Sequence, residues 1–388
     1  GILGAGLLKV FAKIGITVDF IIDQNAEELK QIHNIPVYKS EYGLLTLEGR
    51  PVFLAVSRRT ALEIEREHEK FKHNFYDGLA AQIILQSALC SSTEGRLAYK
   101  ECYDCGILDS QCKALRNNLI ENKGITVSEK NKSHSQKALG YILGQICSLN
   151  CKYCCESIPY LPRDKRHQLS SYTVLKDIRQ FAAACEFLTF VEFIGGEPFL
   201  HKELADILKG VLCIPNIGLI HIFTNGTVLP APELCETLSN TEIVVYISNY
   251  TKELSPQSAK KVEETEKQLI KYGVNFCYGY GKKWFDFSKF AFECDDPDTL
   301  ANNFTNCIFH SCNRLFDGKF YQCPHHYGSD MLNIIPDDND ILHIHNFTSC
   351  ALARELEKKA RRKYINACKY CAMPFNAKLV QPGIQYEA

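Results

Sequence analysis

The sequence CSLNCKYCC, residues 147–155, follows directly on the apolar run YILGQI and holds four cysteines. Three of them are spaced C-x3-C-x2-C, at Cys147, Cys151 and Cys154, and Cys155 comes next. Such a group can hold zinc, close disulfides or bind an iron–sulfur cluster, and closed sites generally take four protein ligands. Three thiolates on a four-iron cluster leave one iron open to a further ligand. Cys155 is adjacent to Cys154 and is therefore poorly placed to ligate the same cluster.

The composition is that of a globular protein with several domains. The chain has 388 residues, 46% of them hydrophobic and 23% charged, with a net charge of -1. We expect no nucleic-acid partner from this charge balance, and no apolar segment approaches the ~20 residues of a membrane span. The sequence shows no signal peptide, so its 19 cysteines favour reduced thiols and metal ligands in a cytoplasmic enzyme over disulfides.

The first 85 residues alternate strand and helix patterns. Gly4 and Gly6 follow the end of a strand, a second strand ends in Asp23, and a third is expected at residues 51–56. This order predicts an N-terminally truncated Rossmann-like domain over residues 1–85, although Lys9 occupies the place of the third fingerprint glycine. Nucleotide binding by the two glycines and Asp23, and a purely structural turn, are both open interpretations.

Residues 86–134 form a predicted connector with four further cysteines, and their spacing fits either a metal site or unligated thiols: Cys90, Cys102, Cys105 and Cys112. Residues 135–295 then repeat β and α patterns. We expect strands at 138–146, 187–194, 218–223, 242–248 and 273–278, with helices at 171–185, 202–211, 232–238 and 258–272. This alternation predicts an α/β fold with a partial (βα)6 TIM-like barrel, whose active site lies at the carboxyl ends of the strands.

Residues 296–388 are predicted to form a separate small α+β module, because cysteines return and the β/α pattern fades. Asp317-Gly318 predicts the turn of a β-hairpin that would place Cys312 opposite Cys323. We expect His325 and His326, which follow the hairpin, to lie on the surface.

Three motifs together resemble the radical S-adenosylmethionine (SAM) enzymes. The spaced cysteines with Tyr153 are similar to the signature loop of that family, Gly195-Gly196-Glu197-Pro198 is similar to its GGEP motif, and Thr224-Asn225-Gly226-Thr227 is common in its barrels. The resemblance implies a [4Fe–4S] cluster on Cys147, Cys151 and Cys154, with SAM on the fourth iron. Reduction would then split SAM into methionine and a 5′-deoxyadenosyl radical that abstracts a substrate hydrogen. The implied SAM-binding residues are Tyr153, Gly195, Gly196, Glu197, Pro198, Asn225 and Ser248.

The last module resembles the twitch or SPASM-type auxiliary-cluster domain of the same superfamily. The resemblance implies one auxiliary [4Fe–4S] cluster on Cys323, Cys368 and Cys371, with Cys307 or Cys312 as the fourth ligand. Four protein ligands would close this cluster to substrate and suit it to electron transfer. Zinc in the module is the alternative.

The N-terminal region resembles the Rossmann module associated with nucleotide-sugars, through its glycines, Asp23 and Ile35-Pro36-Val37. We therefore expect an oxidoreductase-type radical SAM enzyme, a dehydrogenase or epimerase of a sugar or nucleotide-sugar in polysaccharide or natural-product biosynthesis. Its electron donor would be a flavodoxin or ferredoxin. The alternatives are a ribosomal peptide maturase that forms thioether or C–C crosslinks, and a non-catalytic iron–sulfur or zinc protein on the same fold.

Overall fold

The computed structural model divides the chain into two compact units, residues 1–134 and 135–388. In the first unit it describes residues 7–8, 11–12, 16–23, 26–45, 50–55, 64, 67–68, 70–71 and 75–77. In the second unit it describes residues 136–386, except 186–187, 240, 242, 249, 251–252, 280–283, 311 and 337. Gly4, Gly6 and the four cysteines of the predicted connector lie outside the described residues.

The first unit contains short strands in two groups. β1 (Ile21–Ile22) runs parallel to β3 (Ile35–Tyr38), and β2 (Gln31–Ile32) is antiparallel to β3. β4 (Val52–Leu54) runs parallel to β5 (Phe75–Asp77). The described helices are α2 (Ala26–Leu29) and α3 (Ser40–Leu45). Parallel pairs require a crossover between their strands, as a βαβ unit has, and the Rossmann-like assignment of this unit stays a prediction.

The second unit is built on one sheet of eight strands, in the order β10-β9-β8-β7-β6-β12-β13-β14. Six neighbouring strands are parallel to one another: β6 (Gln136–Ile142), β7 (Leu188–Ile194), β8 (Ile217–Thr224), β9 (Val244–Ser248), β10 (Phe276–Gly279) and β12 (Arg314–Phe316). β13 (Lys319–Tyr321) and β14 (Leu342–His343) extend the sheet in antiparallel fashion.

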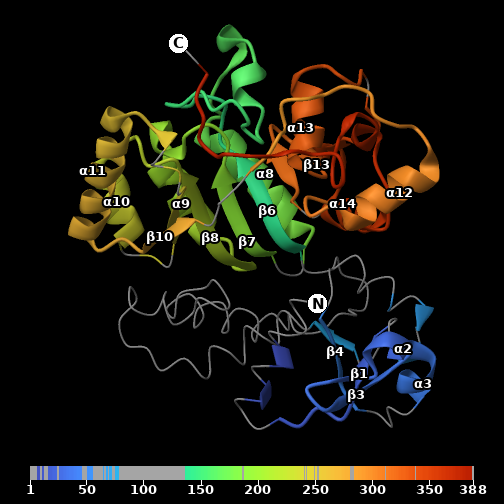
Figure 1. Ribbon diagram of the computed structural model, residues 1–388. Coiled ribbons are helices and arrows are strands. Elements are labelled where there is room, and N and C mark those ends of the chain that lie inside the picture. The colour runs from blue at the N-terminus through green and yellow to red at the C-terminus, as the bar shows by residue number, and fades with distance from the viewer. Residues whose placement is uncertain are drawn as a thin grey trace. The chain divides into compact units, whose positions relative to one another are not determined.

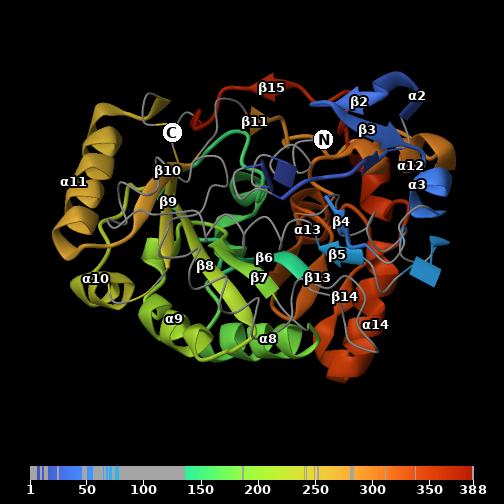
Figure 2. The ribbon, with the colours of Figure 1, turned by 90° about the horizontal axis from the view of Figure 1, so that it is seen from below.

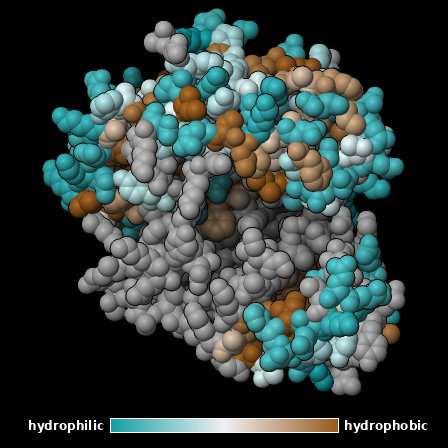
Figure 3. All heavy atoms as spheres, in the orientation of Figure 1, coloured by the Kyte–Doolittle hydropathy of each residue, from teal (hydrophilic) through white to brown (hydrophobic). Residues whose placement is uncertain are grey.

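Four helices lie along the outer side of the parallel strands, as Figure 2 shows: α8 (Ser171–Ala183), α9 (Leu204–Leu212), α10 (Pro232–Ser239) and α11 (Pro256–Tyr272). The apolar faces of these helices pack on the sheet. Ile178 of α8 and the strand residues Val191 and Ile222 are all fully buried in this core. The outer face of α11 is covered by hydrophilic side chains (Figure 3). The alternation of strands and helices confirms the predicted α/β class.

The ends of these helices follow from local chemistry. Ser170 caps α8 by accepting a hydrogen bond from the backbone N–H of Thr173, at 3.2 Å. Ser255 caps α11 in the same way, and Gly273 ends that helix in a left-handed conformation, with φ 71°. The predicted helices and strands of residues 135–295 therefore begin and end within a few residues of the observed ones.

The predicted C-terminal module shares the sheet of the barrel. The Asp317-Gly318 turn, with φ 48° and 70°, closes the expected hairpin and pairs Arg314 with Tyr321. β12 lies beside β6, because Gly140 has no side chain at the place that Arg314 occupies. A Cβ at Gly140 would lie 2.7 Å from Arg314 Nη1. Among the described residues, five of the parallel strands, β6 to β10, come from consecutive βα repeats. The sixth, β12, comes from the later hairpin.

The remaining elements of the module surround this hairpin. They are α12 (Pro297–Asn306), α13 (Pro324–Met331) and α14 (Ser349–Ala360). Two further short strands, β11 (Trp284–Phe285) and β15 (Leu379–Val380), pair with each other. In the described part of the chain, no helix has both the length and the apolar character needed to span a bilayer.

Candidate functional site

The cysteine loop begins where β6 ends, at the carboxyl edge of the parallel sheet. Two backbone hydrogen bonds fold it tightly: the N–H of Cys154 donates to the carbonyl of Cys151 at 3.2 Å, and the N–H of Ser157 to that of Cys154 at 3.0 Å. The loop therefore brings Cys147, Cys151 and Cys154 together, as the spacing predicts.

The three thiols interact electrostatically. The pKa of Cys147 is raised to about 12, mainly by burial and in part by the charges of Glu197 and Cys151. Burial also raises the pKa of Cys154 well above its ordinary value, with contributions from Cys155 and Cys151. Buried thiols of this kind ionise when a metal coordinates them, since the metal supplies the compensating positive charge.

Amide N–H groups point at two of these sulfurs. Cys147 Sγ accepts from the backbone of Leu149 at 3.5 Å and from Asn225 Nδ2 at 3.7 Å. Cys151 Sγ accepts from Gln385 Nε2 at 3.1 Å. Hydrogen bonds to sulfur are a normal part of the surroundings of an iron–sulfur cluster, so the donor set fits the expected cofactor.

Within the described residues, no group of three or more ligand-type side chains converges on a single metal ion. A four-iron cluster binds each thiolate at a different iron atom, so its cysteines need not converge on one point. Cys147, Cys151 and Cys154 stand in one tightly folded loop, an arrangement that is compatible with such a cluster.

The thiol of Cys155 is engaged by a carboxylate. Its thiol is 3.6 Å from Glu156 Oε1, and the Glu156 carboxylate forms a buried ion pair with Arg314. The expectation that Cys155 is not a ligand of the first cluster stays a prediction.

The GGEP segment packs directly against the start of the cysteine loop. The N–H of Gly196 donates to Gly144 and that of Glu197 to Ile146, both at 2.9 Å. A Cβ at Gly196 would lie 2.0 Å from the Ile146 carbonyl oxygen, and Gly195 has φ 123°. The two glycines are therefore required for the close approach of these two backbones.

Glu197 is buried where β7 meets the end of β8. Its carboxylate accepts from Thr224 Oγ1 at 2.6 Å, from the N–H of Asn225 at 2.8 Å and from the N–H of Phe199 at 3.0 Å. Burial raises its pKa to about 7, and these hydrogen bonds oppose the rise. The carboxylate thus joins the GGEP and Thr224-Asn225 motifs, and its contact with the SAM ammonium stays a prediction.

The other predicted SAM-binding residues surround the same edge. Asn225 holds the loop through Ser148 Oγ, at 3.1 Å from its Nδ2, in addition to its contact with Cys147. Pro198 is buried in a short 3-10 helix, Ser248 ends β9, and Tyr153 lies beneath Lys152 Nζ. Their roles towards SAM are proposals to which this geometry is favourable.

Two residues near the cysteines have no signature in the sequence. Tyr250 is partly buried beside them: desolvation raises the pKa of its phenol, and the charges of Cys151 and Cys147 also raise it. Its ring packs edge-on against Trp284 at 5.4 Å. Gln385 reaches Cys151 from a segment 234 residues along the chain. Neither residue belongs to a recognisable motif, so pattern analysis does not find them.

A second group of four cysteines gathers in the C-terminal module. Burial raises the pKa values of all four thiols, and the charge of Cys307 raises those of Cys323, Cys368 and Cys371 further towards the neutral form. Cys307 follows the end of α12, and Cys323 caps the start of α13. The choice between Cys307 and Cys312 as the fourth ligand stays a prediction.

Cys312 is directed elsewhere. Its Sγ lies 3.8 Å from the carbonyl oxygen of Ile308, and it interacts with the Arg314 guanidinium. The observed hairpin pairs Arg314 with Tyr321 and ends there, so the predicted placement of Cys312 opposite Cys323 lies beyond its paired residues and stays a prediction.

Both histidines after the hairpin are buried, so the expectation that they lie on the surface is wrong. His326 Nε2 pairs with Asp338 Oδ2 at 3.0 Å, and its Nδ1 accepts from the N–H of Gln322. His325 stacks on Phe290 with ring centroids 4.4 Å apart. Helix α13 places His325 against the segment 366–370, where its Nε2 hydrogen-bonds the carbonyl of Tyr370 at 2.9 Å.

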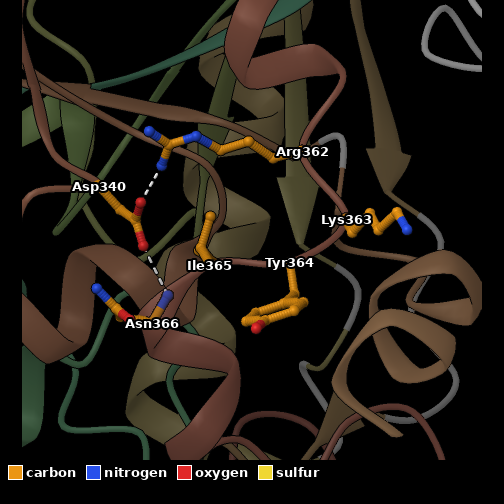
Figure 4. A pocket seen from close by; sticks show the side chains of 6 residues that line it. All are labelled: Asp340, Arg362, Lys363, Tyr364, Ile365 and Asn366. Atoms are coloured by element: carbon orange, nitrogen blue, oxygen red, sulfur yellow. Dashed lines mark hydrogen bonds and ion pairs between the residues drawn. The ribbon is translucent and has the colours of Figure 1, made fainter. Parts of the chain in front are cut away.

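A polar pocket of about 290 Å³ lies beside this module, and Figure 4 shows its lining. Arg362 forms an ion pair with Asp340, whose other oxygen accepts from the N–H of Asn366 at 2.6 Å. Asp340 and Arg362 are thus paired with each other, and no predicted site residue lines the pocket.

Parallel strands with a three-cysteine loop and a GGEP turn at their carboxyl edge define a domain that binds an iron–sulfur cluster. Residues 141–278 match the model of the radical SAM superfamily. This part of the chain is a radical SAM domain, which confirms the expected superfamily. The cofactors of that superfamily are SAM and a [4Fe–4S] cluster.

The curated relatives match over a short stretch. The molybdenum cofactor biosynthesis protein moc-5 of Caenorhabditis elegans is 37% identical over 89 residues, 22% of this chain and 14% of that protein. The GTP 3′,8-cyclase of Stenotrophomonas maltophilia is 33% identical over 88 residues, 23% of this chain and 26% of that protein. The chain therefore spans about a quarter or less of the length of these relatives.

Solved structures of radical SAM enzymes are also similar. BtrN in complex with AdoMet and 2-DOIA shares 16% identity, with 67% of this chain and 98% of that chain covered and a TM-score of 0.36. Streptococcus suis SuiB shares 15% identity, with 44% and 37% covered and a TM-score of 0.31.

Proposed function

We propose that this protein is a radical SAM enzyme that cleaves SAM reductively and abstracts a hydrogen atom from a nucleotide-containing small molecule. The reductive cleavage of SAM is supported by one observation: the loop with Cys147, Cys151 and Cys154 packs directly against the GGEP turn. When bound, the cluster supplies the electron that splits SAM into methionine and the 5′-deoxyadenosyl radical.

The chain's own residues prepare this site. Cys147, Cys151 and Cys154 provide three thiolates and leave one iron for SAM, because Cys155 turns towards Glu156. Glu197 fixes the turn that faces the cluster, and its second carboxylate oxygen retains lone pairs for the SAM ammonium. Tyr153 and Ser248 are assigned to the adenine and the ribose or carboxylate.

A second cluster is part of the proposal. Cys307, Cys323, Cys368 and Cys371 offer four mutually coupled thiols, which is a complete ligand set for one [4Fe–4S] cluster of the twitch or SPASM type. A cluster with four protein ligands has no open iron, so we assign it to electron transfer and not to substrate ligation.

The substrate class follows from two independent pointers to a nucleotide. Curated relatives include GTP 3′,8-cyclases, and the N-terminal pattern of Gly4, Gly6 and Asp23 is one that nucleotide-binding folds use. Sugar oxidation or epimerisation, expected from the sequence, has no support in the similarities. A nucleotide-sugar remains within the proposed class.

The cofactor content is tested by anaerobic reconstitution with iron and sulfide. We expect about eight irons per wild-type chain and about four after Cys147, Cys151 and Cys154 are all changed to Ala. Wild type, but not this variant, should convert SAM to 5′-deoxyadenosine under a flavodoxin or dithionite reductant. A reconstituted protein with full iron that fails to cleave SAM would support the non-catalytic alternative.

The substrate class is tested by deuterium transfer into 5′-deoxyadenosine. Deuterated GTP and nucleotide-sugars are compared with a deuterated peptide, and we expect transfer from a nucleotide only. Transfer from the peptide alone would establish the peptide-maturase alternative and reject the nucleotide.

A further inference from the structure

The segment 379–386 lies across the cysteine loop, as the red end of the ribbon in Figure 1 shows. β15 fixes its start by pairing with β11. At its far end the N–H of Lys152 donates to the carbonyl of Ile384 at 2.7 Å, and the N–H of Tyr386 to that of Asn150 at 2.9 Å. These two bonds flank an antiparallel bridge between Cys151 and Gln385.

The side chain of Gln385 is fixed at both ends of its amide. Its Oε1 accepts from the N–H of Asn150 at 2.7 Å, and its Nε2 donates to the carbonyl of Gly383 at 2.7 Å. A backbone N–H can only donate and a carbonyl can only accept, so these partners determine which way the amide points. The same Nε2 therefore presents its other hydrogen to Cys151 Sγ, at 3.1 Å.

Packing holds the segment in place. The ring of Tyr386 meets Tyr160 edge-on, with centroids 6.4 Å apart, and Tyr160 hydrogen-bonds the carbonyl of Lys152. On the other side Gly383, with φ 76°, lies against the ring of Tyr250, where a Cβ would come within 2.6 Å. The donor is thus pre-positioned by contacts on both sides of Gln385.

We propose that Gln385 is a positioning residue of the SAM cluster, whose N–H···S bond to Cys151 raises the reduction potential of that cluster. The inference rests on the proposed function, since it requires the cluster on Cys147, Cys151 and Cys154. A donor at a thiolate stabilises the more negative, reduced state of a cluster, which makes the electron needed for SAM cleavage easier to supply.

The size of the effect follows from the strength of a charge-assisted hydrogen bond. Loss of one such bond corresponds to about a tenfold smaller equilibrium constant for cluster reduction, or about 59 mV for one electron. A carboxylate in the same place would have a larger effect, because it removes the donor and adds a negative charge beside the sulfur.

The test uses two variants and a matched control in the reconstituted full chain. Gln385→Leu removes the donor at similar size, and Gln385→Glu keeps an acceptor for Asn150 but replaces the donor by a charge. The control is Gln381→Leu in the same segment, because Gln381 hydrogen-bonds Glu253 at 3.1 Å and no thiol. The readout is the midpoint potential of the paramagnetic signal that changes when SAM is added.

We expect wild type and the control to have the same midpoint potential. In Gln385→Leu the equilibrium constant for cluster reduction should be about tenfold smaller, and in Gln385→Glu it should be smaller still. Iron content should stay at the wild-type value in Gln385→Glu. An unchanged potential in both Gln385 variants, or the same shift in the control, overturns the inference. A wild-type chain with no signal that responds to SAM overturns the proposed function instead.

Discussion

Removal of Arg314 should destabilise the second unit strongly. Its guanidinium donates to Glu156 through Nε at 3.0 and 3.1 Å and through Nη2 at 2.7 Å, and the two side chains are only 11% and 8% exposed. Arg314→Met leaves the Glu156 carboxylate buried without its partner, and such a loss costs about 3–5 kcal/mol. The pair joins the cysteine loop to β12, so its loss should destabilise both of these elements.

A double-mutant cycle separates the ion pair from the other contacts of Arg314. Its Nη1 also donates to the carbonyls of Cys312 and Asn313, at 3.2 and 2.9 Å. Glu156→Met with Arg314→Met removes both charges; it loses these two bonds, about 1 kcal/mol each, and the weak contact of the Cys155 thiol with Glu156. The double variant should therefore be more stable than Arg314→Met alone by about 1–3 kcal/mol.

The free energy of unfolding is measured with urea on the metal-free protein under reducing conditions. Trp284, the single tryptophan, lies in the second unit and reports its unfolding by fluorescence. A loss below about 1 kcal/mol for Arg314→Met would refute the reasoning, because an exposed pair would behave so. A double variant no more stable than the single one would refute it as well.

Three further outcomes are expected. Cys307→Ala should lose about four irons from the reconstituted chain and Cys312→Ala none; equal iron counts in the two variants would reject Cys307 as the fourth ligand. Glu197, with a pKa raised by burial to about 7, should make the unliganded protein about 3 kcal/mol less stable as pH rises from 4.5 through 7, and Glu197→Gln should flatten that slope in urea titrations. Burial lowers the pKa of His221 to about 4, so the free energy of unfolding should decrease by about 3 kcal/mol as the pH falls from 6.5 through 4. His221→Leu should remove this decrease in acid unfolding curves.

The barrel elements were predictable because each is written in a local pattern. The run at 187–194 is apolar and β-rich, and it forms β7 at Leu188–Ile194. Ser255 and Gly273 bound α11 by capping chemistry that a single sequence shows. The cysteine loop was predictable for a different reason, since its spacing alone restricts the metal chemistry.

The pairings between distant segments were not predictable. β12 lies beside β6 because Gly140 makes room for Arg314, a relation between residues 174 positions apart that no periodicity records. The bridge of Gln385 to Cys151 involves one residue on each side and leaves no repeating pattern. Cys307 and Cys312 were equivalent in spacing, and only the direction of their side chains separates them.

The placement of β12 has a consequence for how the two proposed clusters are held. The hairpin that leads to Cys323 is fixed to the barrel by the sheet and by a buried carboxylate on α8: Asp177 accepts from the N–H of Gly318 at 2.8 Å and pairs with His345 at 2.6 Å. One turn beyond Cys323, Tyr327 accepts from Gln145 Nε2 at 2.9 Å, at the start of the cysteine loop. Because these hydrogen bonds and the ion pair are directional, they fix the position of one cysteine group relative to the other. A displacement of the hairpin would therefore shift both cysteine groups.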